Sequence, residues 1–118
     1  MATPTLNSWS EIPVEQLNPL LQRQFVHGEQ AMLARFFLAK GCIVPRHSHP
    51  NEQISYIVTG ALSFDFGEGD DRIVKANEVL VIPGNAPHSA IALEDTLAFD
   101  VFAPPREDWI NKTDTYLR

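Results

Sequence analysis

The stretch GCIVPRHSHPNEQISYIVTG, residues 41–60, combines metal-binding side chains with the start of a strand that is apolar on both faces. His47 and His49 are two residues apart, so on an extended strand both project from the same face. Gln53 follows four residues after His49, an even offset that lets it join that face if the chain stays extended. His88 would have to arrive from a neighbouring strand. From the residues alone, a metal site and ordinary hydrogen-bonded histidines both remain open.

Turn residues at short intervals divide the chain from residue 30 onward into strands, which predicts an all-β fold. Residues 61–66 alternate cleanly, with Leu62, Phe64 and Phe66 on one face. The loop at 67–71 is typical of a hairpin. Further strands are expected at 54–58, 79–82, 91–93 and 97–102, the last two as a pair around Glu94 and Asp95.

Helix is expected only as one short turn within 106–118, because Pro13 and Pro19 interrupt the helix-like stretch 14–21. Several strands are apolar on both faces, at 54–58, 79–82 and 98–102. Such strands suit a barrel whose outer surface packs on another subunit, so we expect a homodimer.

The composition restricts partners and location. At 118 residues with a net charge of −6, the chain has the length of one domain and no cluster of Lys or Arg that could bind nucleic acid. No apolar run approaches the roughly 20 residues of a membrane helix. Residues 1–5 do not resemble a signal peptide, so we expect a cytoplasmic protein. Cys42 is the only cysteine, which excludes a disulfide within the chain.

The spacing of residues 41–60 resembles the first motif of the cupin family. Gly41, His47, His49 and Gly60 match that motif, and Gln53 stands where its glutamate would be. Residues 77–92 resemble the second cupin motif. There Pro83 and His88 match, while Asn77, Asn85 and Ala92 replace two glycines and an asparagine.

The resemblance implies a single cupin domain over residues 1–118, a jelly-roll barrel (double-stranded β-helix). Its core would span about 22–104, with an N-terminal arm and a C-terminal tail. The barrel would hold one divalent transition metal ion, Ni, Zn, Fe or Mn, through His47, His49, Gln53 and His88.

A neutral amide at position 53 leaves the double charge of the ion uncompensated, which favours an anionic substrate such as a small sugar acid or organic acid. Glu52 has the opposite strand parity to Gln53 and should point away from the site. If the loop is irregular, Glu52 is an alternative fourth ligand. Cys42 has odd parity relative to His47, so we expect it to point outward and to serve in packing.

Asp100 and Phe102 share one face of the strand expected near the C-terminus. A carboxylate inside a small barrel must be paired, close to a metal, or protonated, because burial of a bare charge is costly. One interpretation is structural, with Asp100 paired to Arg106 across the mouth of the barrel. The other is catalytic.

Asp100-x-Phe102, followed four residues later by Arg106, resembles the C-terminal signature of the pectin-degradation cupins, and residues 47–56 are also similar to theirs. The resemblance implies an enzyme that converts 4,5-unsaturated uronates from pectin or alginate to linear, ketonised sugars. Asp100, Phe102 and Arg106 would be its catalytic residues. The alternatives are another metal-dependent cupin enzyme, a dioxygenase or isomerase, and a non-catalytic module that binds sugars or acids.

Overall fold

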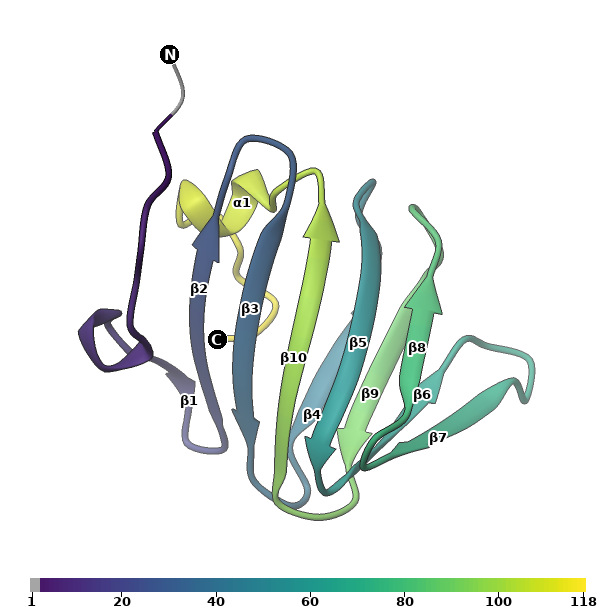
Figure 1. Cartoon of the computed structure of the whole chain (residues 1–118). Helices are drawn as coiled ribbons and strands as arrows, with labels where there is room; N and C mark the ends of the chain where they lie inside the picture. Colours follow the sequence, from purple (N-terminus) through teal and green to yellow (C-terminus); the bar gives the residue numbers. More distant parts are fainter. Residues whose placement is uncertain (1–2) are drawn as a thin grey trace.

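Two antiparallel β-sheets face each other in the computed structural model, which describes residues 3–118 (Figure 1). The larger sheet has six strands in the order β1-β2-β3-β10-β5-β8, and the smaller has four in the order β4-β9-β6-β7. The strands are β1 (Glu15–Asn18), β2 (Leu21–His27), β3 (Met32–Leu38), β4 (Ile43–His47), β5 (Glu52–Thr59), β6 (Ala61–Asp65), β7 (Asp71–Lys75), β8 (Val79–Ile82), β9 (His88–Ala92) and β10 (Thr96–Ala103). The predicted all-β fold is confirmed.

Among the described residues, helical structure is limited to two short elements, the 3₁₀ turn η1 (Trp9–Glu11) and the four-residue helix α1 (Glu107–Ile110). The helical turn expected within 106–118 is therefore present. Within residues 3–118, no helix has the length and apolar character needed to cross a membrane.

The hydrophobic core lies between the two sheets. Strand β3 shows why: its buried and more exposed residues alternate along the strand, so that Met32, Ala34 and Phe36 face inward while Leu33 and Phe37 face outward. Strand β6 alternates in the same way, with Leu62 and Phe64 buried, as its sequence predicts. The barrel interior is therefore built from one face of each sheet.

Turns place the strands in the correct sheet. Gly60 lies between β5 in the larger sheet and β6 in the smaller, with φ 91°, and a side chain there would collide with Asp95 and Thr96. Asn77 (φ 69°) and Asn85 (φ 66°) also adopt the left-handed conformation, at the positions where the cupin pattern has glycine. Asn tolerates this conformation better than most residues, so the barrel keeps these turns.

Two sequence-based expectations were wrong. The strands expected at 91–93 and 97–102 do not pair with each other, because the chain between them crosses from one sheet to the other: β9 pairs with β4 and β6, and β10 with β3 and β5. Cys42 does not point outward; it is 1% exposed and belongs to the core. A register shift in β4 between Val44 and His47 breaks the alternation from which the orientation of Cys42 was inferred.

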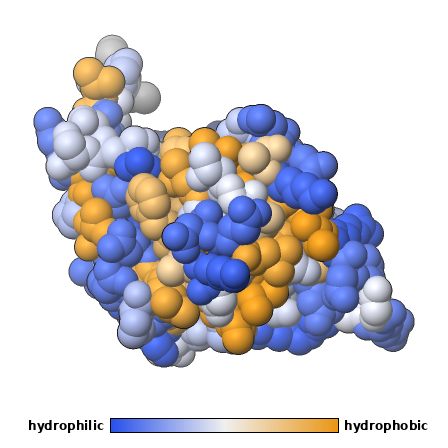
Figure 2. Space-filling model, turned by 90° about the horizontal axis from the view of Figure 1, so that it is seen from below, coloured by the Kyte–Doolittle hydropathy of each residue, from blue (hydrophilic) through white to orange (hydrophobic). Residues whose placement is uncertain are grey.

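The outer face of the larger sheet carries exposed hydrophobic side chains on neighbouring strands. In one row across the sheet, Leu33 of β3, Val101 of β10, Ile54 of β5 and Val81 of β8 are register partners. Three members of this row are exposed to solvent: Leu33 by 37%, Val101 by 37% and Val81 by 57%. By contrast, the end of the molecule seen from below shows hydrophobic patches separated by hydrophilic side chains (Figure 2). The outer face of the larger sheet is where the expected dimer would form.

Val101→Lys should convert a dimer to a monomer, because a charge in the centre of a paired apolar face would lose its hydration. The molar mass in solution, measured by light scattering after size exclusion, checks this. Ile91→Lys is the matched control: Ile91 is 39% exposed, close to the 37% of Val101, but lies on an inner strand of the other sheet. A monomeric wild-type chain, or equal behaviour of the two variants, would contradict the dimer prediction.

Candidate metal centre

Three histidines from two strands and a loop converge inside the barrel. His47 ends β4, His88 begins β9, and these two residues are register partners. His49 lies in the loop after β4 and is 7% exposed. One potential ligand atom from each of the three histidines lies within 4.8 Å of the others, an arrangement that could hold a metal ion.

Each imidazole uses one nitrogen to contact the backbone. Nδ1 of His47 lies 2.7 Å from the carbonyl oxygen of Pro45, Nδ1 of His49 lies 3.0 Å from that of Asn51, and Nδ1 of His88 lies 2.8 Å from that of Ala86. Because a carbonyl can only accept, Nδ1 must carry the proton in each case. Nε2 of each neutral ring is therefore left as a lone-pair donor, the form that binds a metal.

The pKa values of the three histidines favour the neutral form. Burial lowers the pKa of His47 and that of His49 to about 4, and it also lowers the pKa of His88. At neutral pH, protons therefore do not compete for these nitrogens. Nε2 of His88 is buried and has no hydrogen-bond partner within residues 3–118. An unpaired buried nitrogen is costly, and a metal ion would satisfy it.

Gln53, the second residue of β5, completes the group. Its Oε1 lies 3.1 Å from Nε2 of His49, while its Nε2 donates to Oγ of Ser55 (3.0 Å) and to Oδ2 of Asp100 (3.2 Å). These two donations fix the orientation of the amide. Since Nε2 of His49 is unprotonated, two acceptor atoms face each other, and a cation bound between them and the other histidines would relieve the repulsion.

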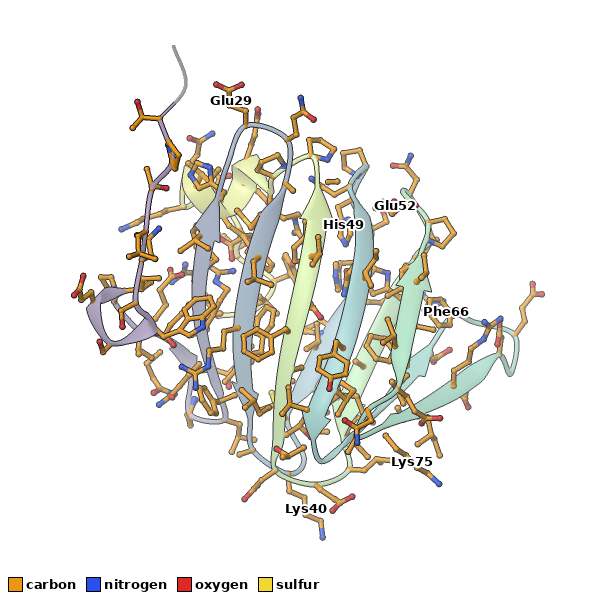
Figure 3. All side chains as sticks on the ribbon, viewed as in Figure 1. Glu29, Lys40, His49, Glu52, Phe66 and Lys75 are labelled. Atoms are coloured by element: carbon orange, nitrogen blue, oxygen red, sulfur yellow. The ribbon has the colours of Figure 1, made fainter. Side chains whose placement is uncertain are left out.

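Glu52 lies at the rim of the barrel and is exposed (Figure 3). Gln53 is 5% exposed, and its Oε1 faces Nε2 of His49. Glu52 is also absent from the group of potential ligands formed by the described residues. The geometry therefore favours Gln53 over Glu52 as a fourth ligand.

Asp100 lies beside this group on β10, directly opposite Ser55 in the register of β5. Burial raises the pKa of Asp100 to about 7, although a hydrogen bond from Ser55 and the charge of Arg106 act in the opposite direction. Near neutral pH the group can therefore both donate and accept a proton.

The structural interpretation of Asp100 required an ion pair with Arg106, and the two residues do not form one. Its Nε and Nη2 donate to the two carboxylate oxygens of Asp108 at 3.0 and 2.8 Å. The guanidinium group is 2% exposed and lies 5.1 Å from the ring centroid of Phe102. Phe102 in turn lies 5.6 Å from His49, measured between ring centroids, so its ring is a neighbour of both Arg106 and that histidine.

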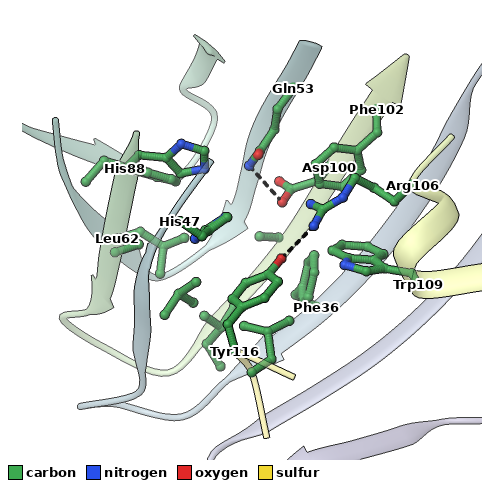
Figure 4. Close-up of a pocket in the computed structure, with 16 residues that line it drawn as sticks. Phe36, His47, Gln53, Leu62, His88, Asp100, Phe102, Arg106, Trp109 and Tyr116 are labelled. Atoms are coloured by element: carbon green, nitrogen blue, oxygen red, sulfur yellow. Dashed lines mark hydrogen bonds between the residues drawn. The ribbon is translucent and has the colours of Figure 1, made fainter. Parts of the chain in front are cut away.

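The residues of the site line one cavity between the two sheets (Figure 4). Its polar lining comes from His47, His88, Gln53, Asp100 and Arg106, and the rest from Phe102 and other hydrophobic residues of both sheets. Sequence reasoning missed three polar neighbours of these residues: Ser55, Trp109 and Tyr116. Ser55 could have been found, because it has the same strand parity as Gln53. Trp109 and Tyr116 gave no such signal, since they lie in the segment after the last strand.

Comparison with known proteins agrees with this architecture. The family model described as "Cupin domain" matches residues 34–102. The pectin degradation protein KdgF of Dickeya dadantii (strain 3937) is 29% identical over 103 residues, which cover 85% of this chain and 93% of the relative. The structure of KdgF from Halomonas sp. aligns with a TM-score of 0.80 and 30% identity, over 89% of this chain and 99% of that one.

An RmlC-like cupin from Shewanella frigidimarina aligns with a TM-score of 0.82 over 91% of this chain and 96% of its own, at 23% identity, a likeness of fold. The family model covers more than half of the residues, and the alignment with the Halomonas protein covers nearly the whole of both chains. This chain therefore belongs to the cupin family, with KdgF pectin degradation proteins among its relatives.

Proposed function

We propose that this chain is a metal-dependent enzyme that converts 4,5-unsaturated uronates, the products of pectin or alginate cleavage, to linear ketonised sugars. Two of its relatives are KdgF proteins, one of them described as a pectin degradation protein. The observation that carries the proposal is the position of Asp100, a buried carboxyl with a pKa of about 7 that is hydrogen-bonded to Gln53 beside three histidines.

The proposed ligands of the metal are His47, His49, His88 and Gln53. These residues suit a divalent transition metal such as Ni, Zn, Fe or Mn, since imidazole nitrogen and amide oxygen bind all of these ions. When bound, the ion would supply Lewis acidity toward the substrate oxygens and attract the negative charge that develops there.

Conversion of an unsaturated uronate needs no net addition of atoms. The bond between C1 and the ring oxygen breaks, C1 becomes an aldehyde as its hydroxyl loses a proton, and the enol at C5 becomes a ketone when a proton reaches C4. Asp100 would carry the proton between these positions, because burial raises the pKa of its carboxyl toward the range in which a group both accepts and donates, an effect that the charge of a bound ion would partly offset. Gln53 and Ser55 would hold its carboxyl in place.

Arg106 would bind the substrate carboxylate, because its guanidinium group lines the cavity and the ion pair with Asp108 uses only Nε and Nη2. Phe102 would shape the pocket and exclude water between Arg106 and His49. The competing function is that of a metal-binding cupin that binds a sugar acid without converting it. The first experiment below distinguishes binding from conversion.

Asp100→Asn should abolish turnover and leave the metal content unchanged, because it removes the proton carrier and keeps the size and shape of the side chain. Turnover is measured as the metal-dependent loss of ultraviolet absorbance of unsaturated galacturonate, above the spontaneous rate. Asp71→Asn, at an exposed position of β7, is the control and should behave as wild type. Full activity of Asp100→Asn would contradict the catalytic role, and uronate binding without conversion by the wild type would favour the binding module.

His49→Ala should lose the metal, because it removes one of three converging imidazoles and leaves the others too few to hold a divalent ion. Elemental analysis of the purified protein gives the metal content per chain. His27→Ala is the matched control, since His27 is exposed and its Nδ1 contacts only the neighbouring Gly28 carbonyl. Metal retained at wild-type stoichiometry in His49→Ala would remove His49 from the ligand set.

The stability of the metal-free protein should depend on Asp100 in a defined pH range. The folded pKa of about 7 lies above the ordinary 3.8, so the folded state keeps a proton that the unfolded state releases. The contribution of Asp100 to the free energy of unfolding should therefore fall as the pH rises from about 4 to about 7, by an amount on the order of a few kcal/mol. The lowered pKa values of His47, His49 and His88 act in the opposite direction over part of this range, so the Asp100 contribution is the difference between wild type and Asp100→Asn. Urea unfolding at several pH values measures this. Asp100→Asn should lack that contribution, and identical pH profiles for the two proteins would refute the assigned pKa.

A further inference from the structure

The segment that follows α1, residues 111–118, returns into the barrel and places Tyr116 in the cavity. The ring of Tyr116 stacks on His47, with centroids 4.5 Å apart and an interplanar angle of 24°. Its phenolic oxygen accepts a hydrogen bond of 2.8 Å from Nη2 of Arg106 (Figure 4). The oxygen of Tyr116 thus uses a hydrogen-bond donor of Arg106 that a substrate carboxylate would need.

Two buried N–H groups face this oxygen. Arg106 uses Nε and Nη2 for Asp108, and the same Nη2 also reaches Tyr116, while Nη1 makes no hydrogen bond within residues 3–118. Trp109 is 2% exposed, and its indole Nε1 lies close enough to the phenolic oxygen to act on the pKa of Tyr116 but makes no well-aligned hydrogen bond with any described residue. Figure 4 shows the indole nitrogen on the side of the ring toward Tyr116. A buried donor without a well-aligned partner is unfavourable, so the arrangement suits a better acceptor than one phenol.

The cavity with Tyr116 in place is too small for a sugar. Its volume is about 50 Å³, room for a few water molecules, whereas sites for small organic ligands typically measure roughly 300–1,000 Å³. Apart from Tyr116 and Leu117, the residues that line it belong to strands or to the turn of α1 and its cap. Residues 115–118 are therefore the part of the lining that can most readily move.

We propose that Arg106 and Trp109 form a carboxylate seat, that the oxygen of Tyr116 fills this seat in the empty protein, and that an acidic sugar displaces Tyr116 when it binds. The inference rests on the proposed function, because it takes the substrate to be a uronate. A carboxylate is a stronger acceptor than a phenol and can receive hydrogen bonds from both donors at once. Tyr116 is then a specificity-determining residue: it keeps the seat closed to ligands that have no carboxylate.

The displacement can occur without unfolding of the whole segment. Asp114 is anchored by a buried ion pair with Arg23, with 3.0 Å between Oδ2 and Nη1 and both side chains fully buried. Beyond Asp114, the segment is held by the Tyr116 contacts, the burial of Leu117 and one hydrogen bond of 3.0 Å from Asn18 to the Leu117 carbonyl. The half-exposed Arg118 adds a hydrogen bond of 3.2 Å from its Nε to the Asp114 carbonyl and a contact of 3.6 Å between its Nη2 and Oε2 of Glu15. The buried ion pair of Asp114 can therefore remain while these few contacts of residues 115–118 break.

Tyr116→Phe tests the seat, because it removes the oxygen that competes with the ligand and keeps the ring that stacks on His47. Binding of galacturonate, a saturated uronate that cannot undergo the proposed reaction, is measured by calorimetry on the metal-loaded protein. The variant should bind galacturonate about tenfold more tightly than wild type, since one hydrogen bond to a charged group no longer has to be broken. Any gain for galactose should be much smaller, because it has no carboxylate to accept hydrogen bonds from Arg106 and Trp109.

Tyr56→Phe is the matched control. The only other tyrosine of the chain lies on the outer face of β5, where its hydroxyl donates to Asn77, and its loss should leave galacturonate affinity unchanged. Trp109→Phe keeps most of the buried ring and removes the second donor, so it should weaken galacturonate binding several-fold without affecting galactose. Thermal melting identifies any variant that fails to fold.

The outcomes separate this inference from the proposed function. If Tyr116→Phe binds galacturonate with unchanged or weaker affinity, or if neither protein binds it, the seat is refuted even when unsaturated uronates are converted. If Tyr116→Phe binds galacturonate more tightly but unsaturated uronates are not converted, the seat stands and the catalytic proposal falls.

Discussion

The site depends on the fact that a neutral imidazole has only one N–H group. In His47, His49 and His88 that proton faces a backbone carbonyl two residues away, so each ring turns its lone pair toward the interior. The pairing of β4 with β9 and the loop after His47 bring these lone pairs together. The backbone thereby determines the protonation state and the direction of the rings before any ligand is present.

Gln53 connects this cluster to Asp100 because an amide has one accepting and one donating end. Its oxygen faces His49 and its nitrogen donates to Asp100 and Ser55. A glutamate in the same place would have no proton to donate when ionised, and its charge would lie close to that of Asp100. The replacement of the usual cupin glutamate therefore fits a site in which a second carboxyl group lies beside the metal ligands.

Much of this arrangement could be predicted from the sequence, because it follows from local patterns. Alternation located strands such as β6, and the spacing from Gly41 to Gly60 indicated the family. The errors arose where a local rule was broken or a contact was distant. The register shift in β4 reversed the expected orientation of Cys42, and the crossing between β9 and β10 separated two strands that looked like a pair. Tyr116 was missed because no spacing rule connects a tail to the strand it covers.

The ion pair between Arg23 and Asp114 has a consequence for the order in which the molecule assembles. The two residues are 91 positions apart, and all the strands from β3 to β10 lie between them in sequence. Closing so long a loop is entropically costly until the intervening strands have paired. The barrel should therefore form first with its interior open on this side, and the final segment should dock last, so that an ion could enter before the wall is complete.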